Sequence, residues 1–276
     1  MSVTHRQKVI LDWVQEQKQV AVEDIAEHFG VTTQTIRRDL NKLCEQGLLR
    51  RHYGGVSLPP RPHNVSIHVR QSRYVARKEV LAQAVAQLIP NHVTISMGVG
   101  STVAQVARAL VQHQGLKVLT NNLNVAAALS VNPDIEVIVS GGQYRHADND
   151  VVGPEVTDFY SSFMTDFGIF SAGSLDVDSG VMDFDVREAE ATRAIIANTR
   201  QRILVADHSK WSQNASCKVA TFNYVDRFYT EAIMPEQRAA IAKTVSLQLC
   251  PLPFPGREDS EEHEMSELVL SKQRSA

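Results

Sequence analysis

The sequence predicts an N-terminal winged helix-turn-helix domain followed by an α/β domain whose parallel-rich sheet has helical crossovers. Three apolar stripes at helical spacing fill the first 56 residues and end in a short basic stretch. Pro59, Pro60 and Pro62 then interrupt any helix or central strand. Beyond residue 73, helical segments alternate with β-branched runs, which is typical of a parallel sheet. A length of 276 residues accommodates both domains.

The composition excludes several classes of protein. Hydrophobic residues make up 43% and charged residues 21%, as in soluble globular chains. The sequence contains neither an apolar run near the roughly 18 residues of a membrane span nor a secretory-type start. Cys44, Cys217 and Cys250 match no metal or redox spacing, so we expect unpaired thiols in a reducing compartment. We therefore expect a cytoplasmic protein with no membrane segment, metal or cofactor.

Charge is distributed unevenly along the chain. Residues 1–73 contain 11 Lys and Arg against 7 Asp and Glu, whereas the remainder contains 17 against 24. A basic first domain on an acidic second one suggests that the first domain meets a polyanion. The imbalance is modest and supports this interpretation only together with the motifs.

The first domain is predicted over residues 3–58, with its helix-turn-helix at about 20–39. Its apolar stripes are Val9, Ile10, Trp13 and Val14, then Val22, Ile25, Ala26 and Phe29, then Ile36, Leu40 and Leu43. Gly30 supplies the turn before the third helix, and Thr32 is its candidate N-cap. Residues 48–56 predict a two-stranded wing.

The phasing of the third helix directs a polar side away from the core. In the major groove, arginine reads guanine and Gln or Asn reads adenine, and the start of a helix favours phosphate. The predicted DNA contacts are Thr32, Thr33, Gln34, Thr35, Arg37, Arg38 and Asn41 on the helix, and Arg50, Arg51 and Tyr53 in the wing. The alternative is a solvated helix face beside a basic surface hairpin.

The second domain is predicted over residues 74–250, after a linker at 59–73 and before an acidic, disordered tail at 251–276. Predicted helices are 74–89, 102–113, 123–130, 157–163 and 187–198, and predicted strands are 93–96, 117–120, 135–140, 167–172 and 202–206. Ligands of open α/β sheets bind outside the carboxyl ends of the strands. Polar residues gather after these strands, which favours a shared pocket there.

The residues of this pocket suit a small anion. Gly100, Ser101 and Thr102 open a helix and offer N–H groups and hydroxyls, although tight-turn glycines alone would also explain this loop. Lys210 adds a positive charge, and Arg145 is predicted to fork onto a phosphate. The acidic residues at 183, 185, 188 and 190 suit a metal or a sugar hydroxyl, or simply the start of a helix.

The stretch VTTQTIRRDLNKLCEQGLLRRHYGG resembles the helix-turn-helix and wing of the DeoR family of bacterial transcriptional regulators. The second domain resembles the sensor domain of that family in LTNNLNVAAAL (119–129), VSGGQYR (139–145), TDFGIFSAGSLD (165–176), FDVREAEATRAIIANTR (184–200) and LVADHSKW (204–211). The resemblance implies a fold related to ribose-5-phosphate isomerases and CoA transferases. It also implies a repressor that a phosphorylated sugar or polyol releases from operator DNA, with glycerol 3-phosphate the first candidate.

The resemblance assigns the phosphate loop to Gly100, Ser101 and Thr102, an amide pair to Asn121 and Asn122, and an Asp–Lys pair to Asp207 and Lys210. We further assign Gly141, Gly142, Arg145 and Glu188 to effector binding. Because operators of such proteins are two-fold symmetric, we expect a homo-dimer or homo-tetramer. No residue is assigned a catalytic or metal-binding role.

Two positions depart from the family pattern. Gly98 stands where Asp or Asn is common, and Thr192 where Lys is frequent. An isomerase-like enzyme with an accessory DNA-binding domain is one alternative, but it needs a positioned carboxylate or lysine as base. A DNA-binding repressor that has lost effector control is the other.

Overall fold

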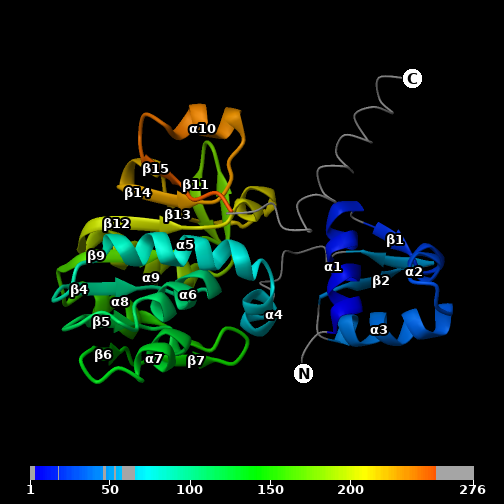
Figure 1. Ribbon diagram of the computed structural model, residues 1–276, viewed down its shortest axis with the longest axis horizontal. Coiled ribbons are helices and arrows are strands. Elements are labelled where there is room, and N and C mark those ends of the chain that lie inside the picture. Colours follow the sequence, from blue (N-terminus) through cyan, green and yellow to red (C-terminus); the bar gives the residue numbers. More distant parts are fainter. Residues whose placement is uncertain (1–3, 18, 46–47, 53, 58–65, 253–276) are drawn as a thin grey trace.

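The computed structural model describes residues 4–252 except 18, 46–47, 53 and 58–65 (Figure 1). The expected tail beyond residue 252, the first part of the linker and Tyr53 lie outside the described residues. The described chain forms one hydrophobic core within residues 10–56 and two larger clusters within residues 81–245. Among the described residues, no helix is long and apolar enough to cross a membrane.

The first domain is a three-helix unit closed by a small sheet. Its elements are α1 His5–Gln17, β1 Gln19–Ala21, α2 Val22–His28, α3 Thr33–Glu45, β2 Arg50–His52 and β3 Gly55–Ser57. The strands pair antiparallel in the order β1-β3-β2. At Gly55 a side chain would come within 2.4 Å of the carbonyl oxygen of Val20, so this close strand pairing requires glycine.

The apolar stripes predicted from the sequence form the core of this domain. The side chains of Ile10, Val14, Ile25, Ile36 and Leu40 are all fully buried. The turn and the cap are present as well. Gly30 adopts a φ of 60°, and the Thr32 hydroxyl accepts a hydrogen bond of 3.3 Å from the Thr35 amide. The wing has its two predicted strands, and β1 adds a third.

The second domain is built on a parallel seven-stranded sheet in the order β15-β14-β12-β9-β4-β5-β6. Its strands are β4 Thr94–Met97, β5 Lys117–Thr120, β6 Glu136–Val139, β9 Thr165–Phe170, β12 Thr199–Val205, β14 Arg227–Thr230 and β15 Ser246–Leu249. Side chains alternate between its two faces. Ile203 and Val205 join one apolar cluster, and Leu204 joins the other.

Helices cover both faces of this sheet, which makes a three-layer architecture (Figure 1). One face carries α5 Val75–Leu88, α6 Ser101–Ala109 and α7 Leu123–Leu129; the other carries α8 Pro154–Ser161, α9 Val186–Ala197 and α10 Pro235–Ile241. Two 3-10 helices, η1 His208–Ser212 and η2 Phe222–Tyr224, complete the connections. The carboxyl ends of β4 and β5 lead directly into α6 and α7.

The five predicted strands and the five predicted helices of this domain are all present, although their first and last residues differ from the prediction. The helix predicted at 102–113 stops at Ala109, and the one predicted at 157–163 begins at Pro154. The prediction missed β14, β15 and α10. It also missed the antiparallel pair β7 Gln143–Arg145 and β8 Asp150–Val152, and the small sheet of β10 Ser174–Asp176, β11 Gly180–Asp183 and β13 Cys217–Ala220.

The described part of the expected linker is not an extended connection. It contains a further helix, α4 Ile67–Ser72, before α5. The Ile67 amide donates a 2.8 Å hydrogen bond to the carbonyl of Ala147 in the turn between β7 and β8. The buried Lys78 ammonium bonds the carbonyls of Arg70 and Arg73 and so closes the carboxyl end of α4. This helix therefore belongs to the second domain by its contacts.

Candidate functional site

The predicted DNA-contacting residues lie together on the outer side of α3 and on the adjacent β2. Thr32, Gln34, Arg37, Arg38, Asn41, Arg50 and Arg51 are exposed, and Thr33 and Thr35 are half-buried. The Arg51 guanidinium donates a 3.2 Å hydrogen bond to the carbonyl of Arg37, which joins the wing to the helix. The structure thus presents exposed basic and polar side chains on one side of α3 and on the neighbouring strand β2.

The acidic residue within α3 lies away from this surface. Asp39 is buried and accepts hydrogen bonds from Arg6 at 2.7 Å and from Gln7 at 3.0 Å, both on α1. Because this carboxylate is paired inside the domain, it does not offset the charge of Arg37 and Arg38 toward a phosphate backbone. The same hydrogen bonds hold α3 against α1.

A pocket lies beyond the carboxyl ends of β4 and β9. Its walls come from the loop before α6, the first turn of α6, the segment after β9 and the end of β11. Helices α4, α9 and η1 complete them. The lining residues are Arg70, Val99, Gly100, Ser101, Thr102, Ser171, Ala172, Gly173, Asp183, Glu188, Thr192 and Lys210. Five of the predicted effector residues meet here: Gly100, Ser101, Thr102, Glu188 and Lys210.

The loop at Gly100 is shaped to present backbone N–H groups. Gly100 has a φ of 116°, which favours glycine, and Ser101 begins α6 with its side chain buried at the pocket wall. The first N–H groups of a helix have no partner within the helix, and its dipole favours negative charge there. This end of α6 is therefore suited to an anion.

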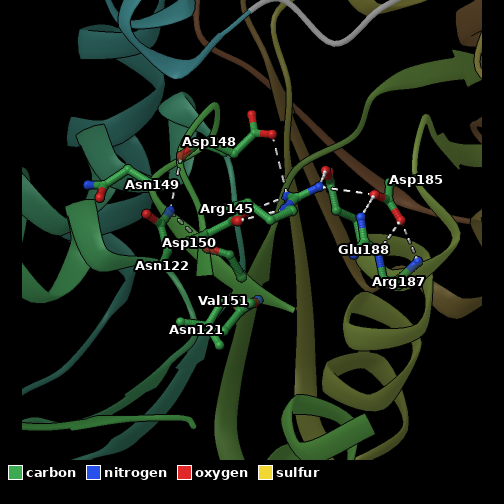
Figure 2. Close-up of polar contacts among 12 residues, drawn as sticks. Asn121, Asn122, Arg145, Asp148, Asn149, Asp150, Val151, Asp185, Arg187 and Glu188 are labelled. Atoms are coloured by element: carbon green, nitrogen blue, oxygen red, sulfur yellow. Dashed lines mark hydrogen bonds and ion pairs between the residues drawn. The ribbon is translucent and has the colours of Figure 1, made fainter. Parts of the chain in front are cut away.

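Neither Asn121 nor Asn122 lines the pocket, and only Asn122 supports this loop. The Asn122 amide donates 3.3 Å hydrogen bonds to the carbonyls of Gly98 and Gly100, and its oxygen caps α7. The Asn121 amide donates to the carbonyl of Val151 at 2.8 Å, and both asparagines are at most 1% exposed (Figure 2). Both side chains hydrogen-bond backbone groups of the protein, and their assignment to effector binding stays a prediction.

Gly141 and Gly142 are exposed at the start of the β7–β8 hairpin and do not line the pocket either. Gly142 has a φ of 131°, and a side chain there would come within 2.8 Å of the carbonyl oxygen of Val152. Glycine at this position is explained by the close pairing of the hairpin.

Arg145 is placed differently from the prediction that it forks onto a phosphate. Its guanidinium binds Asp150 in a bidentate manner, at 2.8 Å from Nε and 2.6 Å from Nη2. Nη1 lies 2.6 Å from Glu188 and 3.2 Å from Asp185 (Figure 2). Arg145 lies behind Glu188 and is not among the residues that line the pocket. Its donors are used by carboxylates of the protein.

Lys210 is the cation most available in the pocket. Within the described residues, its ammonium has no hydrogen-bond or ion-pair partner. Burial lowers the pKa of Lys210, and the nearby Asp207 opposes that effect. Burial alone would raise the pKa of Asp207, but Lys210 and a hydrogen bond from Ser209 lower it overall. The predicted Asp–Lys pair is thus a charged unit beside the pocket.

Two cationic residues of this site were missed by sequence analysis. Arg70 lines the pocket from α4 and hydrogen-bonds Asp148. Lys78 belongs to α5, and its ammonium lies at the carboxyl end of α4, near Asp207 and Lys210; burial lowers its pKa to about 8. Arg70 was hidden in a segment interpreted as linker. The signal available for Lys78 was its place among apolar residues on the inner side of a predicted helix.

The two departures from the family pattern lie in different environments. Thr192 is buried in the pocket wall on α9. Gly98 is buried behind the loop, where a side chain would come within 3.2 Å of Ile195. The Thr192 position therefore touches the space available to a ligand, whereas Gly98 affects the packing of the loop.

The fold and these two surfaces define a class: a winged helix-turn-helix protein with an α/β domain that carries a charged pocket. Residues 6–61 match the DeoR-like helix-turn-helix domain, and residues 73–232 match the DeoR C-terminal sensor domain. The chain belongs to the DeoR family of transcriptional regulators. The predicted fold class is confirmed.

Relatives cover nearly the whole chain. The glycerol-3-phosphate regulon repressor of Escherichia coli K12 is 40% identical over 91% of this chain and 100% of its own length. The transcriptional repressor CsqR of the same organism is 36% identical over 83% of this chain and 88% of its own. The transcriptional repressor AccR of Agrobacterium fabrum is 30% identical over 84% of this chain and 90% of its own length.

Solved structures resemble the chain more distantly. Ribose 5-phosphate isomerase A from Neisseria gonorrhoeae has a TM-score of 0.34 at 17% identity, with 49% of this chain and 52% of that one covered. The sorbitol operon regulator SorC from Klebsiella pneumoniae has a TM-score of 0.34 at 14% identity, with 75% and 91% covered.

Proposed function

We propose that this chain is a DNA-binding repressor of a carbohydrate or polyol operon that a phosphorylated sugar or polyol releases from its operator. Glycerol 3-phosphate is the first candidate effector. The observation that carries this proposal is the pocket in which the amino end of α6 meets Lys210, whose ammonium forms no hydrogen bond or ion pair with the described residues. A phosphate dianion suits both groups, since helix N–H groups and an ammonium each stabilise negative charge.

The rest of the pocket suits the remainder of such an effector. Asp183 and Glu188 line it beside Thr192 and offer oxygen atoms to hydroxyl groups. Burial and the neighbouring Glu188 raise the pKa of Asp183, so this carboxyl group is inclined to hold a proton and to donate. A compact molecule with a phosphate at one end and hydroxyls at the other would use all of these groups.

The first domain would supply operator recognition. Arg37, Arg38 and Gln34 would read base edges, and Arg50 and Arg51 would contact the phosphate backbone. A homo-dimer or homo-tetramer would place two such surfaces on the halves of a symmetric operator. The effector would act by preferring the arrangement in which the paired domains no longer match both half-sites.

The decisive experiment measures binding of the full chain to DNA from its own upstream region by fluorescence anisotropy at fixed salt. The complex is titrated with glycerol 3-phosphate, other phosphosugars and unphosphorylated glycerol. Release by a phosphate ester, but not by glycerol, is expected. If another phosphate ester releases the DNA and glycerol 3-phosphate does not, that ester is the effector. Operator binding that no ester alters would reject the sensor function and favour a repressor without effector control.

The enzyme alternative receives less support. The relatives described above are all named as repressors, and Glu188, a carboxylate in the pocket, is already paired with Arg145. Incubation of the purified chain with the same phosphosugars, followed by product analysis, tests it directly. Turnover would establish an enzyme.

A further inference from the structure

The pocket places acidic side chains beside the cations that would hold a phosphate. Asp183 and Glu188 line it together with Lys210 and Arg70. Both carboxylates lie close enough to Lys210 to favour its charged form. A buried carboxylate without another partner would take Lys210 as its counter-ion, because unpaired buried charges are costly. The cation would then be less available to an incoming anion.

Arg145 supplies that other partner from outside the pocket. Its Nη1 lies 2.6 Å from Oε1 of Glu188, which is 4% exposed. The bidentate contact with Asp150 holds the guanidinium plane in place, and Asp185 adds a contact at 3.2 Å (Figure 2). Arg145 comes from β7 and Glu188 from α9, so the ion pair closes the wall between the hairpin and the helix.

The same guanidinium also reaches the carboxylate beside the other pocket cation. Nη2 of Arg145 lies 3.6 Å from Asp148, and Asp148 accepts a hydrogen bond from Arg70. Arg145 thus contacts one carboxylate near Lys210, Glu188, and one beside Arg70, Asp148, whereas Asp207 and Asp183, which also lie near Lys210, are not among its partners in the described part of the chain.

We propose that Arg145 is a positioning residue of the effector site that touches no effector: it compensates Glu188, so that Lys210 remains available to the phosphate group. This inference rests on the proposed phosphate-ester site. In this inference Arg145 acts on the phosphate indirectly, through Glu188, and not by direct contact. The two arrangements can be distinguished, because substitution of Glu188 restores phosphate affinity to an Arg145 variant only if Arg145 acts through Glu188.

The test measures binding of inorganic phosphate and of glycerol 3-phosphate to the full chain by calorimetry and thermal shift. Arg145→Met is expected to weaken phosphate binding by roughly tenfold or more, because Glu188 then competes for Lys210. Arg145→Met combined with Glu188→Gln is expected to recover most of the affinity for inorganic phosphate, which needs no hydroxyl partner. Such non-additivity is the signature of two residues that act on one another.

Arg187→Met is the matched control. Arg187 belongs to the same cluster and pairs with Asp185 at 2.6 Å, but it neither lines the pocket nor pairs with Glu188 (Figure 2). Its removal should leave phosphate affinity within about twofold, as for a surface ion pair. Equal losses in Arg187→Met and Arg145→Met would show a general effect of cluster charge and overturn the inference.

Failure of the double variant to recover affinity would mean that Arg145 contacts the anion itself or only supports the fold, and either result overturns the inference. Should Arg145→Met not fold, Arg145→Met/Asp150→Asn removes the bidentate carboxylate as well, and Glu188→Gln is then added to that background with the same expectation. A wild-type chain that binds neither phosphate nor any ester would instead reject the proposed function. The two failures are thus distinguishable.

Discussion

The predicted DNA-contacting surface and the pocket are built in opposite ways. The surface consists of neighbouring residues on α3 and β2, all within residues 32–51, and its side chains point to solvent. The pocket gathers residues from α4, α6, α9, β11 and η1, which span residues 70–210, and several of them are buried. A recognition surface can therefore follow from local periodicity, whereas the pocket depends on how distant segments pack.

Charge is managed differently in the two regions. On α3 the acidic Asp39 turns inward to Arg6 and Gln7, so the outer arginines keep their charge toward DNA. In the pocket, acids and bases share one space, and the availability of Lys210 depends on the partners of Glu188. The four predictions below exploit this difference.

The largest expected effect separates the two domains. Leu40→Ala leaves a cavity in the fully buried core of the first domain and should cost about 2–5 kcal/mol of its stability, with loss of DNA binding. Leu204→Ala, equally buried in the second domain, should act on effector binding instead. Calorimetric unfolding with both binding assays measures this. A single transition lowered equally by either substitution would show that the domains unfold as one unit.

Removal of the pocket ammonium comes next. Lys210→Met should weaken binding of a phosphate ester by about 1.5–3 kcal/mol, the range of a charged hydrogen bond, and leave DNA affinity without effector unchanged. Lys218→Met, on the exposed side of β13, is the control and should bind the ester normally. Titration calorimetry decides between them. Normal ester binding by Lys210→Met would remove Lys210 from the site.

On the other surface, Arg37→Ala should lose about 1–3 kcal/mol of base discrimination and leave effector binding intact. We expect the preference of this variant for operator over scrambled DNA to fall by that amount relative to the wild type. Lys42→Ala, also exposed on α3, should weaken both DNAs alike through the loss of a charge. Anisotropy at several salt concentrations checks both variants. If Arg37→Ala were as selective for the operator as the wild type, Arg37 would have no role in base reading.

The smallest expected effect is a pH dependence in which stability and binding move in opposite directions. Lys78 has a pKa of about 8 in the folded chain against 10.5 for an exposed lysine. Between these values the unfolded chain binds more protons, so this lysine makes folding more favourable as pH rises from about 8. Loss of its charge near Lys210 should meanwhile weaken binding of an ester that is already dianionic.

Thermal unfolding and ester affinity measured between neutral pH and about pH 10 check this prediction. The expected loss of affinity is a few-fold and is centred near pH 8, and Lys78→Gln should remove the step there. An ester affinity that stays constant through this range would show that the Lys78 charge does not reach the ligand. Asp207, Lys210, Arg70 and Arg73 are the charged groups around Lys78, and their influence is included in its titration.

The sequence predicted the order of helices and strands around the pocket because hydrophobic spacing and β-branched runs are local signals. It missed α4, because a short polar helix next to a proline-rich stretch resembles a linker. It missed the β7–β8 hairpin and the small antiparallel sheet for a similar reason: strands of three or four residues carry too little alternation to predict.

The sequence by itself determined the outer side of α3 and the position of the Gly100–Thr102 loop. Helical periodicity assigns each residue of α3 to a face, and a loop that follows a parallel strand and begins a helix can lie only at the carboxyl edge of the sheet. The buried Ile36 and Leu40 and the exposed Arg37 and Arg38 agree with this spacing.

Only the tertiary structure decided the partners of the polar and charged residues. Asn121 and Asn122 follow β5, and Arg145 is the last residue of β7, yet the asparagines bind backbone carbonyls and Arg145 binds carboxylates. Arg70 and Lys78 enter the site because α4 packs against the β7–β8 hairpin. Ion pairs form between side chains that folding brings within a few ångströms, and no local pattern in the chain encodes that distance.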